Sequence, residues 1–164
     1  MTLKPLHKDA IKGALAKAER YRLLNEPAEA ESICLDVLEV EPGNQEAGIT
    51  LLLALTDQFG DDGQAYQRAR DALARLSGEY ERAYYGGMIA ERRAKAQMNR
   101  STGASVGVYE WIRDAMESYE RAEALRPAGN DDARLRWNAC VRFLARHPGL
   151  APAAEERREL EMLE

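Results

Sequence analysis

The sequence has few of the side chains that most often carry chemistry, with 2 histidines and 2 cysteines among 164 residues. His7 and His147 lie near opposite ends of the chain, and neither has a Cys, Asp or Glu at a spacing typical of metal ligands. Cys34 and Cys140 fall inside apolar helical patterns, which predicts buried, reduced thiols that stay protonated. We therefore expect no metal, no cofactor and no catalytic centre, and interpret the protein as a non-enzyme.

Excess positive charge and long apolar runs are missing too. The net charge is -5 and the sequence pI is about 5.3, whereas a broad nucleic-acid surface needs a net basic face. The longest apolar run, Ile49 to Leu55 with Thr50 inside it, is too short to span a bilayer. The first ten residues, MTLKPLHKDA, lack the apolar stretch of a signal peptide. These absences predict a cytoplasmic protein that binds neither nucleic acid nor membrane.

Aromatic residues are sparse, at 7%, while alanine, leucine, glutamate and arginine are abundant. Apolar residues make up 45% and charged residues 31%, which is typical of a globular protein, and the abundant types favour helix. A chain of this length fits one domain that can bury a core of its own. Composition therefore predicts a single all-α domain, and the alanine and arginine content fits a bacterial source with a GC-rich genome.

Apolar residues that recur every three or four positions predict seven amphipathic helices, separated by Pro, Gly and Asn residues that interrupt the helices. The predicted spans are 9–24, 27–40, 45–58, 64–76, 79–98, 108–125 and 131–146, followed by a short charged helix in 152–164. Pro27 suits a first helical position, Asn44 can cap the third helix, and Leu135 is expected to face inward. The pair Gly86 and Gly87 costs about 1 kcal/mol per glycine inside a helix, so we expect a neighbouring helix to cross closely there.

One pattern of small, aromatic and proline residues occurs twice in the chain. Ala115, Tyr119, Ala122 and Pro127 follow steps of four, three and five residues, and Ala30, Cys34, Val37 and Pro42 repeat the same steps. Two copies of one spacing, each ending in a proline that stops a helix, indicate an internal repeat. The chain is therefore expected to be a stack of helical hairpins.

Helix pairs of about 34 residues that carry a small residue, an aromatic residue, an alanine and a proline at these spacings resemble tetratricopeptide repeats. Ala18 and Tyr21 match the small residue and the tyrosine of the family's first helix. The resemblance divides the chain into repeats at 11–44, 45–78 and 79–129, with a capping helix and tail at 130–164. The second repeat departs from the pattern, because Gly78 occupies the place of the proline.

The third repeat is longer than the family pattern. Pro42 and Pro127 are 85 residues apart, whereas two plain repeats need about 68. The roughly seventeen extra residues lengthen both helices of the third hairpin and supply the loop from Arg100 to Gly107. We expect this hairpin to protrude. The loop is interpreted as a flexible connection, with anion binding at the start of the next helix as the alternative.

The resemblance implies a right-handed superhelical stack of antiparallel hairpins, whose concave groove is lined by the first helix of each pair. Such proteins hold a peptide or a helix of another protein there, as adaptors, scaffolds or chaperones. The implied groove positions are Leu15, Glu19 and Arg22 on the first helix, Ile49, Leu53 and Thr56 on the third, and Tyr84, Tyr85, Met88, Glu91 and Arg92 on the fifth. By residue type, the best contacts are Tyr84, Tyr85, Met88 and Arg92, and the alternative for the tyrosines is packing between hairpins.

The same architecture also suits other functions. The positions of the family's carboxylate clamp carry Leu15, Glu19, Thr50, Glu81 and Tyr85, so the clamp of heat-shock cochaperones is absent. Bacterial secretion chaperones with this architecture are similar to the chain in length, acidity and repeat number, so a role of that kind stays open. A self-associating assembly or regulatory subunit, such as a homodimer, is the alternative function, and the elongated third hairpin is the alternative binding surface.

Overall fold

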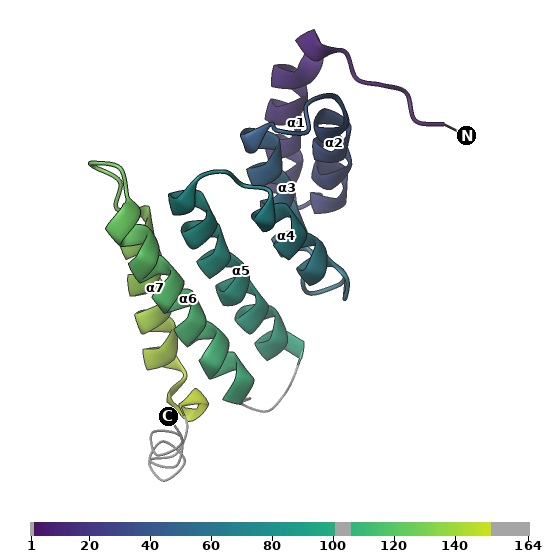
Figure 1. Cartoon of the computed structure of the whole chain (residues 1–164). Coiled ribbons are helices and arrows are strands. Elements are labelled where there is room, and N and C mark those ends of the chain that lie inside the picture. The colour runs from purple at the N-terminus through teal and green to yellow at the C-terminus, as the bar shows by residue number, and fades with distance from the viewer. Residues whose placement is uncertain (1, 101–105, 152–164) are drawn as a thin grey trace.

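The computed structural model describes residues 2–100 and 106–151, and every regular element within these ranges is a helix (Figure 1). The α-helices are α1 (Ile11–Leu23), α2 (Pro27–Val40), α3 (Gln45–Asp57), α4 (Ala65–Ala74), α5 (Glu79–Arg100), α6 (Val106–Leu125) and α7 (Asp132–Arg146). Two single-turn 3-10 helices, Lys8–Ala10 and Pro148–Leu150, flank them. The predicted all-α fold is confirmed. The predicted helix in 152–164 and the loop between α5 and α6 lie outside the described residues.

Local sequence accounts for where the helices begin and end. Pro27 is the first residue of α2, where its missing N–H is not needed. The side chain of Asn44 accepts a hydrogen bond from the N–H of Ala47 (2.9 Å) and caps α3. Asn25 adopts the left-handed conformation, with φ at 60°, just after α1 stops. All seven predicted helices are present, and each end lies within two residues of its predicted position.

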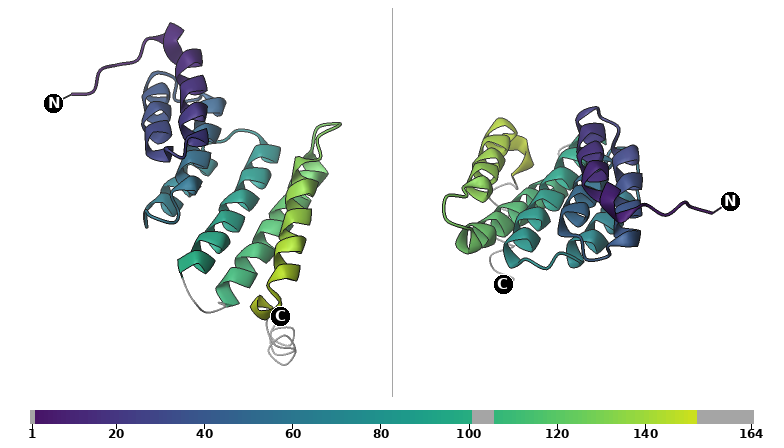
Figure 2. Two further views of the ribbon diagram at one scale, coloured as in Figure 1. Left: turned by 180° about the vertical axis from the view of Figure 1, so that it is seen from behind. Right: turned by 90° about the horizontal axis from the view of Figure 1, so that it is seen from above.

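The helices form two groups. The first group, α1–α4, consists of two hairpins of short helices, between 10 and 14 residues long. The second group, α5–α7, contains the two longest helices, α5 with 22 residues and α6 with 20. Figures 1 and 2 show the two groups side by side, with α5 packed against α3 and α4 on one side and against α6 on the other. The predicted lengthening of the third hairpin is therefore confirmed.

Each group buries a core of its own. Leu52, Leu55 and Ala69 are at the centre of the first core, and α5 adds Ile89 to it. The second core contains Val108, Ile112 and Tyr119 from α6, together with Ala133, Cys140 and Phe143 from α7. Leu135 lies outside the inward stripe of α7 and is 63% exposed, so the prediction that it faces inward is wrong. Because the two cores share α5, this helix couples the groups.

The two copies of the repeated motif occupy equivalent places in the two groups. The side chains of Ala30, Cys34 and Val37 in α2 and of Ala115, Tyr119 and Ala122 in α6 are all 0% exposed. Pro42 and Pro127 are exposed, and each follows the last residue of its helix by two positions. The common steps in the sequence therefore mark the same inward stripe on two different helices.

Helices α5 and α6 approach each other closely at Gly87. A Cβ atom built on Gly87 would lie 2.8 Å from the ring of Tyr119 and 3.1 Å from the carbonyl oxygen of Ala115. The close crossing predicted from the glycine pair is confirmed at this position. A Cβ on Gly86 would instead lie 3.6 Å from Leu73, which is an ordinary contact distance. One glycine of the pair is therefore required by packing and the other is not.

Candidate functional site

The residues predicted to line a groove divide into two sets. The side chains of Glu19, Arg22, Ile49, Leu53, Tyr84, Tyr85 and Arg92 are exposed or partly exposed, whereas Leu15, Thr56, Met88 and Glu91 are buried. A buried side chain cannot touch a partner unless the helices around it separate. The prediction that these four lie on an open surface is therefore wrong, and partner contact by the other seven stays a prediction.

Glu91 lies inside the second group and is 0% exposed. Its carboxylate accepts a hydrogen bond from the hydroxyl of Tyr119 (2.8 Å) and pairs with Lys95 Nζ (2.5 Å) and Arg136 Nη2 (2.7 Å). A buried carboxylate is tolerated only when charged or hydrogen-bonding partners surround it. Glu91 therefore holds α5, α6 and α7 together and is no groove residue.

Leu15, Thr56 and Met88 are buried for other reasons. Leu15 packs with Ile11 and Val37 where α1, α2 and α3 meet. The hydroxyl of Thr56 donates to the carbonyl oxygen of Leu53 (2.8 Å) and accepts a hydrogen bond from Arg92 Nη1 (2.8 Å). Met88 is 7% exposed, on the same stripe of α5 as Glu91 and Tyr84. All three side chains therefore lie inside the molecule and not on the open face that the repeat register implies.

Tyr84 and Tyr85 lie at the junction of the two groups and point to different cores. The ring of Tyr84 is 5.8 Å from that of Tyr80 and 5.9 Å from that of Tyr119, on the second core, and burial raises the pKa of Tyr84 to about 12. Tyr85 packs on the first core, and its ring meets that of Tyr84 edge-on at 5.1 Å. Both tyrosines therefore have a packing role, while part of each side chain stays at the surface.

Three charged residues form a ladder across the first helices of the hairpins. Arg22 of α1 donates from Nε to Asp57 Oδ2 of α3 (2.8 Å), and Arg92 of α5 binds the other carboxylate oxygen of Asp57. The three side chains are partly exposed, at 20%, 25% and 28%. Each step of the ladder spans 35 residues, close to the length of one helical hairpin. Sequence reasoning missed Asp57, although this equal spacing to the two arginines could have found it.

Apolar and aromatic side chains lie on the same helix faces as the ladder. Leu53 precedes Asp57 by four residues, Ile49 precedes it by eight, and Tyr85 precedes Arg92 by seven, so each lies above its neighbour on one face. We define the ladder face as Glu19, Arg22, Ile49, Leu53, Asp57, Tyr85 and Arg92. An open hollow of about 510 Å³ adjoins this face, between the end of α3 and the C-terminal half of α5. The ladder face therefore combines charge with partly exposed apolar surface.

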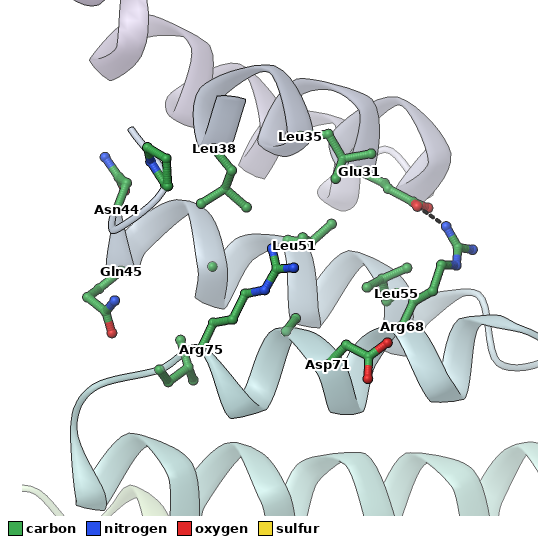
Figure 3. Close-up of a pocket in the computed structure, with 14 residues that line it drawn as sticks. Glu31, Leu35, Leu38, Asn44, Gln45, Leu51, Leu55, Arg68, Asp71 and Arg75 are labelled. Atoms are coloured by element: carbon green, nitrogen blue, oxygen red, sulfur yellow. Dashed lines mark hydrogen bonds and ion pairs between the residues drawn. The ribbon is translucent and has the colours of Figure 1, made fainter. Parts of the chain in front are cut away.

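A second concavity lies on the other side of α3, between α2 and α4 (Figure 3). It has a volume of about 240 Å³. Leucines from α2, from α3 and from the segment after α4 line it, and polar side chains, including Glu31, Arg68 and Arg75, surround its rim. We call it the α2–α4 pocket. Nothing in the sequence pattern indicated it, because its residues are spread over 31–76 with no shared motif.

Both cysteines are buried and unpaired, as predicted. Burial raises the pKa of each thiol to about 12, so both stay protonated at neutral pH and are poor nucleophiles. Among the described residues, no three His, Cys, Asp or Glu side chains are grouped so that they could hold a metal ion. Within the same part of the chain, none of the helices combines the length and the apolar character that crossing a membrane requires.

Comparisons of the chain with models of protein families, with curated proteins and with solved structures give no match.

Proposed function

We propose that this chain is a protein-interaction module built as a tetratricopeptide-like stack, with three hairpin repeats and α7 as the cap. In this proposal the stack is right-handed, and a peptide or helix of a partner protein lies along the ladder face. The observation that carries the proposal is the ladder itself: Arg22, Asp57 and Arg92 are equally spaced in sequence and lie side by side on α1, α3 and α5. Such regular placement is what a repeat of about 34 residues would produce.

The chemistry of the ladder face suits a protein ligand. Arginine and tyrosine are enriched where interfaces hold most of their binding energy, and the face offers Arg22, Arg92 and Tyr85 beside the apolar Ile49 and Leu53. The partner's apolar side chains would pack on Leu53 and Tyr85. Its polar groups would meet the two guanidinium groups, which are held in place by Asp57. Two reduced, buried thiols fit a protein of the cytoplasm.

The test is affinity capture from an extract of the source cells with three forms of the full chain. The ladder variant carries Arg22→Ala and Arg92→Ala. The matched control carries Arg20→Ala and Arg113→Ala, which removes the same charge from exposed positions on α1 and α6. Circular dichroism first establishes that all three forms are folded.

The proposal predicts a partner that the wild type and the control capture equally. The ladder variant should capture it at least about tenfold less, because truncation of an interface hot spot typically costs 2 kcal/mol or more. Equal capture by all three forms would contradict the proposal. A concentration-independent dimer in light scattering, with no partner captured by any form, would favour the self-associating alternative instead.

A further inference from the structure

The α2–α4 pocket is a preformed apolar cavity. Its floor is α3, which contributes Gly48, Leu51 and Leu55, and its walls come from Leu38 of α2 and Leu76 beyond α4. Gly48 leaves the floor open, since a Cβ atom there would already lie 3.3 Å from Leu76 Cδ2. A cavity of ~150 Å³ is enough for benzene, so the 240 Å³ here have room for one large aliphatic or aromatic side chain.

Most polar groups on the rim are already paired within the chain. Asn44 donates to Glu41 (2.9 Å) in addition to capping α3, and Gln45 accepts from the N–H and the hydroxyl of Ser77 (2.8 and 3.0 Å). At the opposite end of the pocket, Arg68 pairs with Glu31, as drawn in Figure 3. Arg68 also pairs with Asp62. These bonds fix the rim and leave few groups free for a ligand.

Arg75 is the exception on this rim. Its side chain is exposed and forms no hydrogen bond or ion pair with any part of the chain that the structure describes. Figure 3 shows it extending from α4 across the mouth of the pocket towards Leu51. Asp71, one turn earlier on α4, takes a hydrogen bond from Gln67 (3.0 Å) and makes no ion pair with Arg75. The guanidinium group of Arg75 therefore lies unpaired at the mouth of an apolar cavity.

We infer that the α2–α4 pocket is a second binding site, which takes a segment of a partner protein with an apolar side chain next to an acidic one. The apolar side chain fills the cavity between Leu38, Leu51 and Leu76. The neighbouring carboxylate accepts two hydrogen bonds from the guanidinium of Arg75, whose planar fork matches a carboxylate. Charge complementarity selects this partner over a neutral apolar segment, which would leave Arg75 unpaired.

This site is separate from the ladder face. Helix α3 directs Gly48, Leu51 and Leu55 into the pocket, whereas Ile49, Leu53 and Asp57 lie on the ladder face. The two surfaces share no residue. A failure of one proposal therefore leaves the other untouched.

The test is a nuclear magnetic resonance titration of the full chain, with leucine methyl groups and backbone amides labelled. The probe is the blocked dipeptide N-acetyl-leucyl-glutamyl-amide, which carries only a side-chain carboxylate. Two control probes each remove one part of the proposed recognition: the leucyl-glutaminyl peptide lacks the charge, and the alanyl-glutamyl peptide lacks the large apolar group. The protein variants are Arg75→Gln and, as a matched control on exposed α6 surface, Arg113→Gln.

The glutamyl probe should shift the signals of Gly48, Leu51 and Leu76 saturably. It should bind about fivefold more tightly than the glutaminyl peptide, because that peptide cannot form the ion pair with the exposed Arg75. It should bind about tenfold more tightly than the alanyl peptide, which has no large apolar side chain to bury in the cavity. Arg75→Gln should abolish the preference for the glutamyl over the glutaminyl peptide, while Arg113→Gln leaves it intact.

Three results would overturn the inference. The glutamyl and glutaminyl peptides could bind equally, the shifts could fall on Leu53 and Tyr85 instead of the pocket, or no peptide could shift any pocket signal. If the pocket signals move with protein concentration alone, a second copy of the chain occupies the pocket, and the inference is wrong as well.

Discussion

The two groups of helices both bury a core but differ in the side chains that they bury. In α1–α4 the helices are short and the core is mostly alanine and leucine, with the ladder partly exposed and the buried Glu31 paired with the partly exposed Arg68. In α5–α7 the helices are longer, and the charged Glu91 network lies inside the group. The repeated motif is common to both groups, so the difference arises from what surrounds it. Repeat spacing fixes the inward stripe, while the lengthened hairpin adds polar contacts that the spacing does not predict.

Arg93 joins the two groups. Its guanidinium lies 3.7 Å from the centre of the Tyr66 ring on α4 and 4.2 Å from that of Trp111 on α6. Cation–π contacts of this kind stabilise by about 0.5–2 kcal/mol each, depending on how far water is excluded. The groups are thus connected both through the shared helix α5 and through one cation between two aromatic rings.

The largest expected effect is at Glu91. Glu91→Ala leaves Arg136 and the hydroxyl of Tyr119 without their partner, and we expect it to lower the free energy of unfolding by about 3–5 kcal/mol in urea titration. The comparison in the first group is Glu31→Ala, which removes a buried carboxylate from Arg68 and from Gln58 Nε2 (2.7 Å). Arg68 is 40% exposed and keeps Asp62, and Gln58 keeps the carbonyl oxygen of Ala54, so the expected loss is smaller, about 1–2 kcal/mol. Equal losses from the two variants would remove the distinction between the groups.

The next largest effect is the change in stability when a glycine is replaced by alanine, and it has opposite signs in the two groups. Gly87→Ala places a Cβ atom against the Tyr119 ring and the Ala115 carbonyl, and we expect a loss of about 1–2 kcal/mol from overpacking, net of the better helix propensity. Gly48→Ala meets only the flexible end of Leu76, so helix propensity should dominate and raise stability by up to about 1 kcal/mol. Thermal unfolding of both variants checks this, and a stabilising Gly87→Ala would refute the close crossing.

A smaller effect is expected at the connection between the groups. Arg93→Leu removes the cation from between Tyr66 and Trp111, and we expect a loss of about 1 kcal/mol. The matched control Arg113→Leu, on exposed surface, should stay within about 0.5 kcal/mol of the wild type. Urea titration of both variants measures the difference. Identical midpoints and slopes would show that the cation between the rings contributes nothing.

The smallest expected effect is on the two thiols of the native protein. With pKa values of about 12, Cys34 and Cys140 should react with a thiol reagent near neutral pH only when their group opens. Glu91→Ala should therefore accelerate labelling of Cys140 and leave that of Cys34 unchanged. Mass spectrometry of the labelled peptides separates the two rates. Equal acceleration would mean that the groups open as one unit.

Sequence reasoning predicted the helices well because their signals are local. Pro27, Asn44 and the apolar periodicity act over a few residues, and the repeated steps identify an inward stripe without any knowledge of the neighbours. Glu91 was misplaced because the partners that allow its burial, Tyr119 and Arg136, come from two other helices. The α2–α4 pocket was missed for a related reason, since a cavity between three helices depends on how their side chains pack together.

We propose that a partner protein lies on the ladder face. The most direct measurement is hydrogen–deuterium exchange of the full chain, free and with its captured partner bound. We predict slower exchange in α1, α3 and α5 around Arg22, Leu53 and Arg92, with α7 unchanged. Protection confined to α6 and α7, with α1 and α3 exchanging as in the free chain, would contradict the claim and place binding on the elongated hairpin.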